Sequence, residues 1–349
     1  MFTQILAIVF VLGVIVLIHE WGHFISARSI GIAVQEFAVG LGPAIWKRQG
    51  KSTLYSVRCI PFGGYCLFNS ELEGEDRKGR PLSIVNRKAL SKAYICVAGP
   101  VMNFLLAAVL FTVVFSFIGV PVAYEAVIGE VQPDSPAAEG GMLPGDRVLS
   151  IGGEALESWS DLSRVLAAYR NEESVEFHIQ RGAEGLILEV KPRLNEEEDR
   201  VLIGVIVDQR RAVVEKVSPW RGVRLGLSQT FIMMGALLEA IAHMATGRIS
   251  VSENISGPVA LAQVIMETAS TGLSNTLFLT AFLSVNLGIM NLLPLPALDG
   301  GKIIMYAVEL IRRKPLKLEV EGWINVVGFV LLISLMVILT FKDIFQLFT

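Results

Sequence analysis

Charge is scarce in this sequence. Asp, Glu, Lys and Arg make up 18% of its 349 residues, while apolar residues make up 52%. Soluble domains usually carry about a quarter charged residues, so this composition argues against an ordinary soluble protein. The sequence also lacks a dense tract of Lys and Arg, so we expect no nucleic-acid partner. The shortage of charge instead indicates a chain that lies largely in a lipid bilayer.

Cysteine and histidine are scarce as well. The three cysteines, Cys59, Cys66 and Cys96, form no C-x-x-C pair, and their odd number excludes a complete disulfide framework. We therefore expect reduced thiols. Of the four histidines, His178 falls in a strand pattern and His243 on an amphipathic helix, so neither is expected to bind a metal.

Four long apolar segments can each cross a hydrocarbon core of about 30 Å, which needs roughly 20 helical residues. We expect spans at 1–30, 94–120, 273–300 and 322–345. No positively charged side chain precedes the first apolar run and no small-residue cleavage site follows it. We therefore expect a retained span there and not a signal peptide.

The distribution of charge predicts how these spans are oriented. The loop 31–93 holds ten Lys/Arg against five Asp/Glu, and the loop 301–321 is also basic, whereas residues 121–218 hold 19 Asp/Glu against 10 Lys/Arg. The positive-inside rule places the two basic loops in the cytoplasm. The acidic block and both termini are then expected on the outer side.

Residues 225–246 are apolar enough to suggest a fifth span. They contain Gln229, Glu239 and His243, and arginines flank them. We favour amphipathic helices at the outer interface over 209–272. A fifth span would place Asp299, discussed below, on the wrong side of the membrane.

Residues 36–46 and 53–67 are rich in β-branched, aromatic and glycine residues, with a turn signal at 49–52. Their glycines and apolar tips favour a re-entrant β-hairpin that dips into the membrane. Non-helical backbone is tolerated at that depth only where protein or water covers it. An ordinary cytoplasmic hairpin is the alternative.

Residues 121–208 read as a compact soluble module of short strands and two helices. The stretch SPAAEGGMLPGDRVLSIGG, at 135–153, resembles a bacterial PDZ domain. PDZ domains capture extended peptides at a sheet edge, and the resemblance implies a binding loop near 124–130. A structural domain without a peptide ligand is the alternative.

The first span contains His19-Glu20-Trp21-Gly22-His23. Histidines at i and i+4 lie on one helix face, so both imidazoles can converge on one ion, and the neighbouring Glu is placed to activate a water. This is the H-E-x-x-H zinc signature. A buried structural histidine is the alternative, but polar groups in a span cost roughly 2.5–3.5 kcal/mol each on insertion scales, and a metal compensates for them.

A catalytic zinc usually has three protein ligands and one open position. Asp299 is the only carboxylate between Glu267 and Glu309, and Pro294 and Pro296 before it break the helix so that the backbone can turn inward. We expect Asp299 to be the third ligand. A helix N-cap or an interface residue is the alternative.

Three motifs now resemble the site-2 protease family of intramembrane zinc metalloproteases: HEWGH at 19–23, AGPVMN at 98–103 and NLLPLPALDGG at 291–301. The PDZ module makes the chain similar to the bacterial regulator-of-sigma-E-protease type, with room for one such module. The resemblance implies a polytopic α-helical membrane protein with four transmembrane helices, a membrane-associated β-hairpin and an inserted α+β PDZ domain. It also implies the bacterial cytoplasmic (inner) membrane, with the PDZ domain on the extracytoplasmic side.

The resemblance implies one catalytic zinc ion held by His19, His23 and Asp299, with Glu20 as general base. It implies that Asn103 and Asn291 position the substrate, for which interhelical hydrogen bonding is the alternative. The implied activity is endopeptidase cleavage of transmembrane segments in single-span proteins, during regulated intramembrane proteolysis of an anti-sigma factor or a remnant signal peptide.

A transmembrane helix must unwind before it is cut, and the hairpin at 36–67 could hold it as an added strand. Proline at an edge position such as Val57 should then lower cleavage. Two other functions compete: a PDZ-bearing membrane adaptor with a relic site, and a metal transporter. The intact Glu20 and three ligands argue against the first, and the clustering of polar groups at one membrane level argues against the second.

Overall fold

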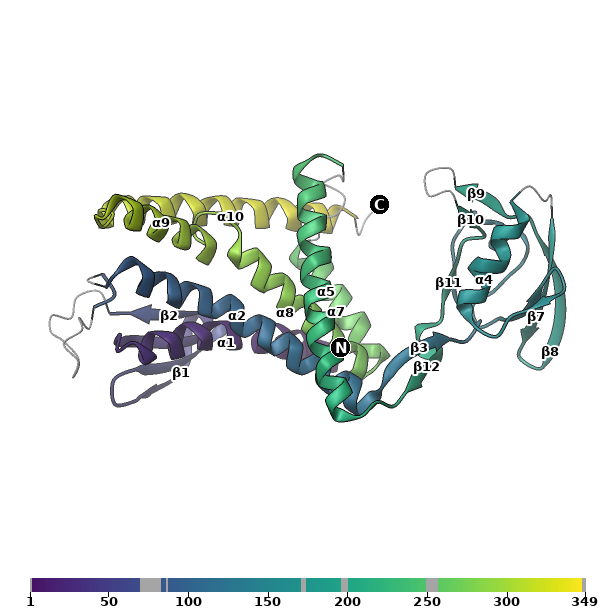
Figure 1. The fold of residues 1–349 in the computed structure, drawn as a ribbon, viewed down its shortest axis with the longest axis horizontal. Coiled ribbons are helices and arrows are strands. Elements are labelled where there is room, and N and C mark those ends of the chain that lie inside the picture. Colours follow the sequence, from purple (N-terminus) through teal and green to yellow (C-terminus); the bar gives the residue numbers. More distant parts are fainter. Residues whose placement is uncertain are drawn as a thin grey trace. The chain divides into compact units, whose positions relative to one another are not determined.

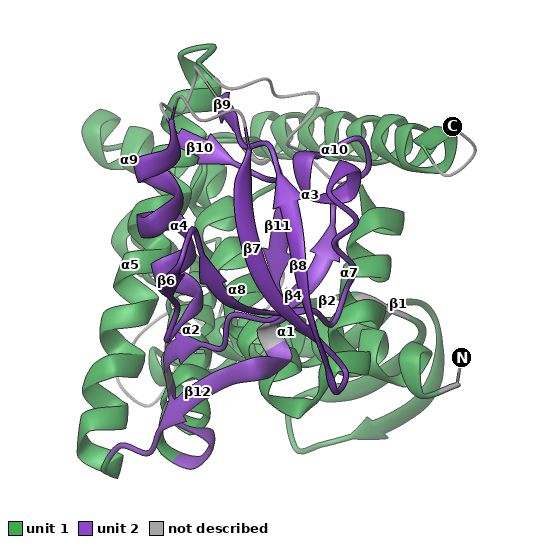
Figure 2. Cartoon of the chain, turned by 90° about the vertical axis from the view of Figure 1, so that its right-hand side faces the viewer, with its two compact units in different colours: residues 1–116, 218–349 green, residues 117–217 purple. Residues whose placement is uncertain are grey.

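The computed structural model describes residues 2–69, 83–85, 87–170, 174–195, 200–248 and 257–346. The chain divides into two compact units, coloured separately in Figure 2. Residues 1–116 and 218–349 form the first, which we call the helical unit. Residues 117–217 form the second, the PDZ-like unit.

Long helices dominate the helical unit (Figure 1). They are α1 (Phe2–Ser29), α2 (Ala89–Val113), α5 (Pro219–Ala245), α7 (Pro258–Thr271), α8 (Leu273–Leu292), α9 (Asp299–Arg312) and α10 (Leu318–Gln346). α2 runs on into a π-helical turn, η1 (Val114–Ile118). Within the described residues five helices are long and apolar enough to cross a membrane: α1, α2 with η1, α5, α8 and α10. The expected number of four spans is therefore not confirmed.

α5 is the additional candidate, and it differs in direction. In Figure 1 it runs across the direction of α1, α2 and α10. Two of its glycines lie where it crosses α2 and η1: a side chain on Gly222 would collide with Ser116 of η1, and a Cβ on Gly226 would lie 2.7 Å from the backbone nitrogen of Thr112 in α2. Small residues thus allow the two backbones to approach closely. The interfacial position of α5 stays a prediction.

The third span is shorter than expected. α8 ends at Leu292 and not at residue 300, because Pro294 lacks a backbone N–H and disfavours a helical residue before it. Asp299 is instead the first residue of α9. α9 also replaces much of the loop expected at 301–321, since Met305 and Tyr306 give it a buried face.

α7 has no N-cap side chain of its own, because Gly257 occupies that position. α10 supplies the cap: the Asp343 carboxylate accepts hydrogen bonds from the backbone N–H groups of Gly257, at 3.0 Å, and Ala260, at 2.9 Å. Asp343 is only 4% exposed. The negative charge also suits the positive end of the helix dipole, so this contact holds α7 to α10.

Two long antiparallel strands, β1 (Val34–Gln49) and β2 (Leu54–Phe68), form the expected hairpin. Residues 34–39 pair with 64–68, and residues 44–49 pair with 54–58. Residues 36–39 also lie beside 54–57, so Val57 has partners on both sides, Val39 and Trp46. The expectation that Val57 lies at an edge is therefore wrong. Among the described residues the outer segments of this sheet are 44–49 and 64–68.

Short strands and two short α-helices form the PDZ-like unit. Its elements are β3 (Val120–Tyr124), β4 (Ile128–Val131), α3 (Pro136–Glu139), β5 (Arg147–Ile151), β6 (Glu154–Ala155), α4 (Trp159–Leu166), η2 (Ala167–Tyr169), β7 (Val175–Arg181), β8 (Glu184–Val190), β9 (Arg193–Asn195), β10 (Arg200–Leu202), β11 (Val205–Val207), η3 (Gln209–Arg211) and β12 (Ala212–Glu215). A four-stranded sheet of order β6-β5-β7-β8 encloses a core that includes Ile151, Phe177 and Ile179. The unit extends to residue 217, beyond the expected boundary at 208, because β12 returns to pair with β3.

The expected peptide-binding loop near 124–130 is paired on both sides by this chain. The N–H of Ile128 donates to the carbonyl of Asp146 at 2.8 Å, and the N–H of Asp208 donates to the carbonyl of Val127 at 3.0 Å. β4 also pairs with β11. A peptide therefore cannot add a strand there. In the described part of the unit, β11 pairs on one side only, with β4.

Candidate metal centre

Three side chains from two helices converge in the helical unit. His19 and His23 come from α1, and Asp299 begins α9. Oδ2 of Asp299 lies 3.2 Å from Nε2 of His19 and 3.2 Å from Nε2 of His23, and the two Nε2 atoms are 3.2 Å apart. The three residues are 6%, 8% and 7% exposed. This is the one group of three potential metal ligands within the described residues.

The triangle of ligand atoms fits a zinc ion. Ligands in a tetrahedron with bonds of about 2.0–2.1 Å lie about 3.3–3.4 Å apart, close to the three observed separations. Oδ2 of Asp299 is also buried and accepts no hydrogen bond from the described residues, although both ring nitrogens are near. Lone pairs that converge in this way on a buried point need a cation to compensate for their burial. A catalytic zinc site adds a water as the fourth ligand to three protein ligands of this kind.

α2 packs so closely on this cluster that it fixes both imidazoles. Nδ1 of His23 donates to the backbone carbonyl of Ile95 at 2.8 Å, which leaves Nε2 as the ligand atom. A Cβ on Gly99 would lie 2.5 Å from Nε2 of His23 and 2.9 Å from Cε1 of His19. On the α1 side, a side chain on Gly22 would collide with Ala98. Both glycines are therefore required by the close approach of α1 and α2.

A tightly packed loop delivers Asp299. A side chain on Gly300 would collide with the backbone carbonyl oxygens of Leu292 and Leu293, and one on Gly328 of α10 would collide with Pro296. Ala297 has φ of 69°, a left-handed conformation that costs a non-glycine residue about 1–3 kcal/mol and persists only where packing holds it. The loop is therefore held firmly from α8 to α9.

Glu20 lies between the cluster and the hairpin. A Cβ on Gly64 of β2 would be 3.1 Å from Cγ of Glu20 and 2.9 Å from the carbonyl oxygen of Ala38. Gly64 belongs to the outer segment 64–68. Cγ of Glu20 therefore lies against the face of the hairpin at Gly64, in this outer segment.

The two asparagines expected near the site differ in position. Asn103 of α2 is fully buried, and its amide nitrogen is 3.3 Å from Nδ1 of His19. Asn291 is half-buried near the end of α8, and its side chain has no hydrogen bond within the described residues. Gly64, Gly99 and the carbonyl of Ile95 were not expected as parts of the site.

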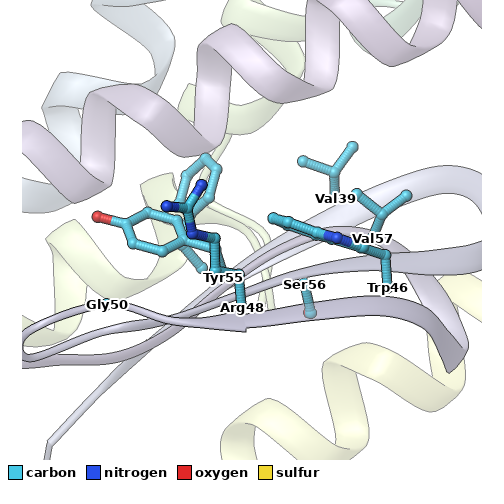
Figure 3. A pocket seen from close by; sticks show the side chains of 8 residues that line it. Val39, Trp46, Arg48, Gly50, Tyr55, Ser56 and Val57 are labelled. Carbon is cyan, nitrogen blue, oxygen red and sulfur yellow. The ribbon is translucent and has the colours of Figure 1, made fainter.

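The hairpin carries a pocket of about 470 Å³ that is separate from the three ligands. Figure 3 shows Arg48 beside Tyr55 at one end and Trp46 with Val39 and Val57 at the other. The same sheet face packs on Phe24 of α1, whose ring centroid is 6.1 Å from that of Tyr55. The pocket is apolar and aromatic, so it is suited to an apolar side chain.

The chain is similar over nearly its whole length to one known protein family. The family described as "Peptidase family M50" matches residues 7–335. The zinc metalloprotease RasP of Oceanobacillus iheyensis is 31% identical over 428 residues, covering 99% of this chain and all of the relative. The RasP of Geobacillus kaustophilus is 28% identical over 423 residues, covering 99% of this chain and 98% of the relative. A solved PDZ domain of an SdrC-like protein from Listeria monocytogenes is 22% identical and covers 26% of this chain and 94% of its own, with a TM-score of 0.23.

Proposed function

Because the chain belongs to peptidase family M50, we propose that it is an intramembrane zinc endopeptidase that cuts the transmembrane segments of single-span membrane proteins. The chain is a zinc metalloprotease and a multi-pass membrane protein. The observation that carries the proposal is the buried triangle of His19, His23 and Asp299, which spans α1 and α9.

We assign zinc to these three side chains and general base catalysis to Glu20. When bound, zinc supplies Lewis acidity, which acidifies a water and polarises the scissile carbonyl. Glu20 takes the proton from the attacking water and passes it to the leaving amine. Its place supports this role, because Glu20 follows the ligand His19 directly in α1 and its Cγ lies against Gly64 of the hairpin.

Segment 64–68 is the proposed site of substrate addition. Helical substrates have their backbone groups bonded internally, so an unwound stretch needs new partners within the membrane. An outer strand offers such partners, and this one lies beside Glu20. Asn291 lies near the end of α8 and its amide has no partner among the described residues, so we propose it as a hydrogen-bond donor to the substrate backbone.

The PDZ-like unit is proposed to sort substrates on the extracytoplasmic side of the bacterial cytoplasmic membrane. The acidic block 121–218 and the basic loops favour this orientation. In that arrangement α5 and α7 lie at the outer interface. The unpaired side of β11 is the edge at which a peptide could add. Anti-sigma factors and remnant signal peptides are the proposed substrates.

Cleavage by the purified protein tests the proposal. A model single-span substrate is incubated with wild type, with Glu20→Gln, and with wild type after chelation. We expect cleavage by wild type alone, zinc content unchanged in Glu20→Gln, and recovery when zinc is restored to the chelated protein. Cleavage that survives Glu20→Gln would refute the mechanism, and failure to cut any membrane substrate would favour an adaptor.

Disulfide cross-linking tests strand addition separately. Leu67 lies in segment 64–68 and is 46% exposed, whereas Cys59 is exposed and outside that segment. One Glu20→Gln protein carries Leu67→Cys as its only cysteine and another keeps only Cys59, and single cysteines are placed along the substrate's transmembrane segment. We expect Leu67→Cys to cross-link to a narrow set of substrate positions and Cys59 to do so weakly. Equal cross-linking from both would exclude this edge.

A further inference from the structure

Nδ1 of His19 is the ring nitrogen that faces neither of the other two proposed ligands, so its hydrogen-bond partner must come from elsewhere. Nε2 of the same ring faces Asp299 at 3.2 Å, so a neutral imidazole that binds zinc there must carry its proton on Nδ1. The equivalent Nδ1 proton of His23 has an acceptor, the carbonyl of Ile95. The Nδ1 proton of His19 needs an acceptor too, because an unpaired buried donor costs about 1–3 kcal/mol.

Asn103 is the side chain at that position. It is 0% exposed, and its Nδ2 is 3.3 Å from Nδ1 of His19. Two donors would then face each other, while Oδ1 of Asn103 is buried and has no partner within the described residues. Rotation of the amide by 180° exchanges the two atoms and removes both faults at once.

We propose that Asn103 is the positioning residue of His19: its Oδ1 accepts the Nδ1–H and holds the ring so that Nε2 faces the metal. The proposal rests on the proposed function, which makes His19 a zinc ligand. It differs from the expected role in substrate positioning, because a fully buried side chain packed on His19 has no free surface toward a substrate.

The backbone around Asn103 is itself fixed. The hydroxyl of Ser284 in α8 donates to the Asn103 carbonyl at 2.9 Å, and both residues are fully buried. The next residue, Phe104, packs against Gly288, where a Cβ would lie 2.6 Å from its ring. α8 therefore sets the position of Asn103, and Asn103 sets the ring of His19. A merely structural interhelical bond would not need an acceptor at Oδ1.

Metal affinity of the purified full chain in detergent tests the proposal. Zinc affinity is measured by competition with a chelator, and the visible spectrum of the cobalt-loaded protein reports ligand geometry. Asn103→Leu should weaken zinc binding by 10- to 100-fold and alter the cobalt spectrum. Asn103→Asp keeps an acceptor and should retain near wild-type affinity and spectrum. Asn275→Leu, which removes a half-buried amide near the start of α8 that bonds only to Thr271 among the described residues, should change neither.

The outcomes separate this proposal from the assignment of the ligands. His19→Ala must lose zinc if His19 is a ligand, and retention of zinc there would refute the proposed site itself. If His19→Ala loses zinc but Asn103→Leu binds it normally, only the positioning role is refuted. If Asn103→Asp is as weak as Asn103→Leu, the amide does not act as an acceptor and the proposal also fails. Native elution and melting of each variant exclude misfolding, and Asn103→Asp provides the comparison if Asn103→Leu does not fold.

Discussion

Gly99 of α2 leaves no room for a side chain beside His23 of α1, since a Cβ there would lie 2.5 Å from the ring nitrogen Nε2. The metal site therefore depends on a helix that contributes none of its three ligands. α2 holds the imidazole of His23 through the carbonyl of Ile95 and faces that of His19 with Asn103. The two histidines that stand out in the sequence acquire their geometry from their neighbour.

Substitution of Gly99 by alanine should disrupt the site. The added methyl group must displace both rings, so we expect zinc affinity to fall by roughly tenfold or more and cleavage to fall with it. Gly13→Ala in α1 is the control, because a Cβ there meets nothing within 4 Å. Chelator competition measures the effect. Equal zinc affinity in Gly99→Ala and wild type would show that the space between α2 and the two imidazoles can accept a methyl group.

Gly64→Ala should separate catalysis from metal binding. Its methyl group would press on Cγ of Glu20 and on the carbonyl of Ala38, so we expect kcat to fall by about 10- to 100-fold while zinc content stays the same. Gly185→Ala in the PDZ-like unit, where a Cβ meets nothing within 4 Å, serves as control. Full activity of Gly64→Ala would remove the support for substrate addition beside Glu20.

The PDZ-like unit should lose stability in acid through one ion pair. Asp146 is 1% exposed and accepts hydrogen bonds from Arg181, at 2.8 Å, and from the N–H of Leu143, at 2.9 Å. Burial alone would raise the pKa of Asp146, but these hydrogen bonds outweigh it, and the pKa lies below its ordinary value. Such an acid stabilises the fold above its unfolded pKa, near 3.9, and that contribution is lost as the pH falls through the folded pKa.

Arg181→Gln should therefore raise amide exchange in β5 and β7 of the full chain by roughly tenfold at pH 7. The difference from wild type should shrink as the pH falls below about 4, because Asp146 protonates first in the variant and then, at its lowered pKa, in wild type. Arg164→Gln breaks the ion pairs of an exposed arginine with Glu154 and Asp161 and should have little effect. A difference for Arg181→Gln that persists unchanged into acid would contradict the pairing with Asp146.

Asp343→Ala should loosen the start of α7. Loss of the two hydrogen bonds to Gly257 and Ala260 should cost about 1 kcal/mol and raise amide exchange in the first turn of α7 about fivefold. Glu267→Ala, which removes an exposed carboxylate from α7 itself, should not. Unchanged exchange in Asp343→Ala would mean that α10 does not cap α7.

The sequence predicts the metal ligands better than the residues that position them. His19, His23 and Asp299 are recognisable because ionisable residues are rare in apolar segments, and the structure brings these three together. The carbonyl of Ile95 left no such signal, because every residue has a backbone carbonyl. Gly99 lies within one of the motifs, but the need for glycine there arises only from the close packing of α1 against α2, which the sequence does not show.

The expectations about the fold that differ from the structure also failed for physical reasons. The basic residues near 312 suggested a loop, although buried Met305 and Tyr306 place a helical face there. The alternation of residues 53–67 indicated a strand but could not tell that Val57 would be paired on both sides, since strand neighbours are a long-range property. α5 is long and apolar enough to cross a membrane. Its close crossing of α2 and η1 depends on Gly222 and Gly226, and the sequence alone does not show that contact.

The zinc K-edge X-ray absorption spectrum of the purified, zinc-loaded wild-type protein tests the proposed site most directly. A site made of His19, His23, Asp299 and a water predicts four nitrogen and oxygen neighbours at about 2.0–2.1 Å, with the multiple-scattering pattern of two imidazoles. A sulfur neighbour near 2.3 Å, from Cys66 or Cys96, or a spectrum without two imidazoles, would contradict the proposed ligands.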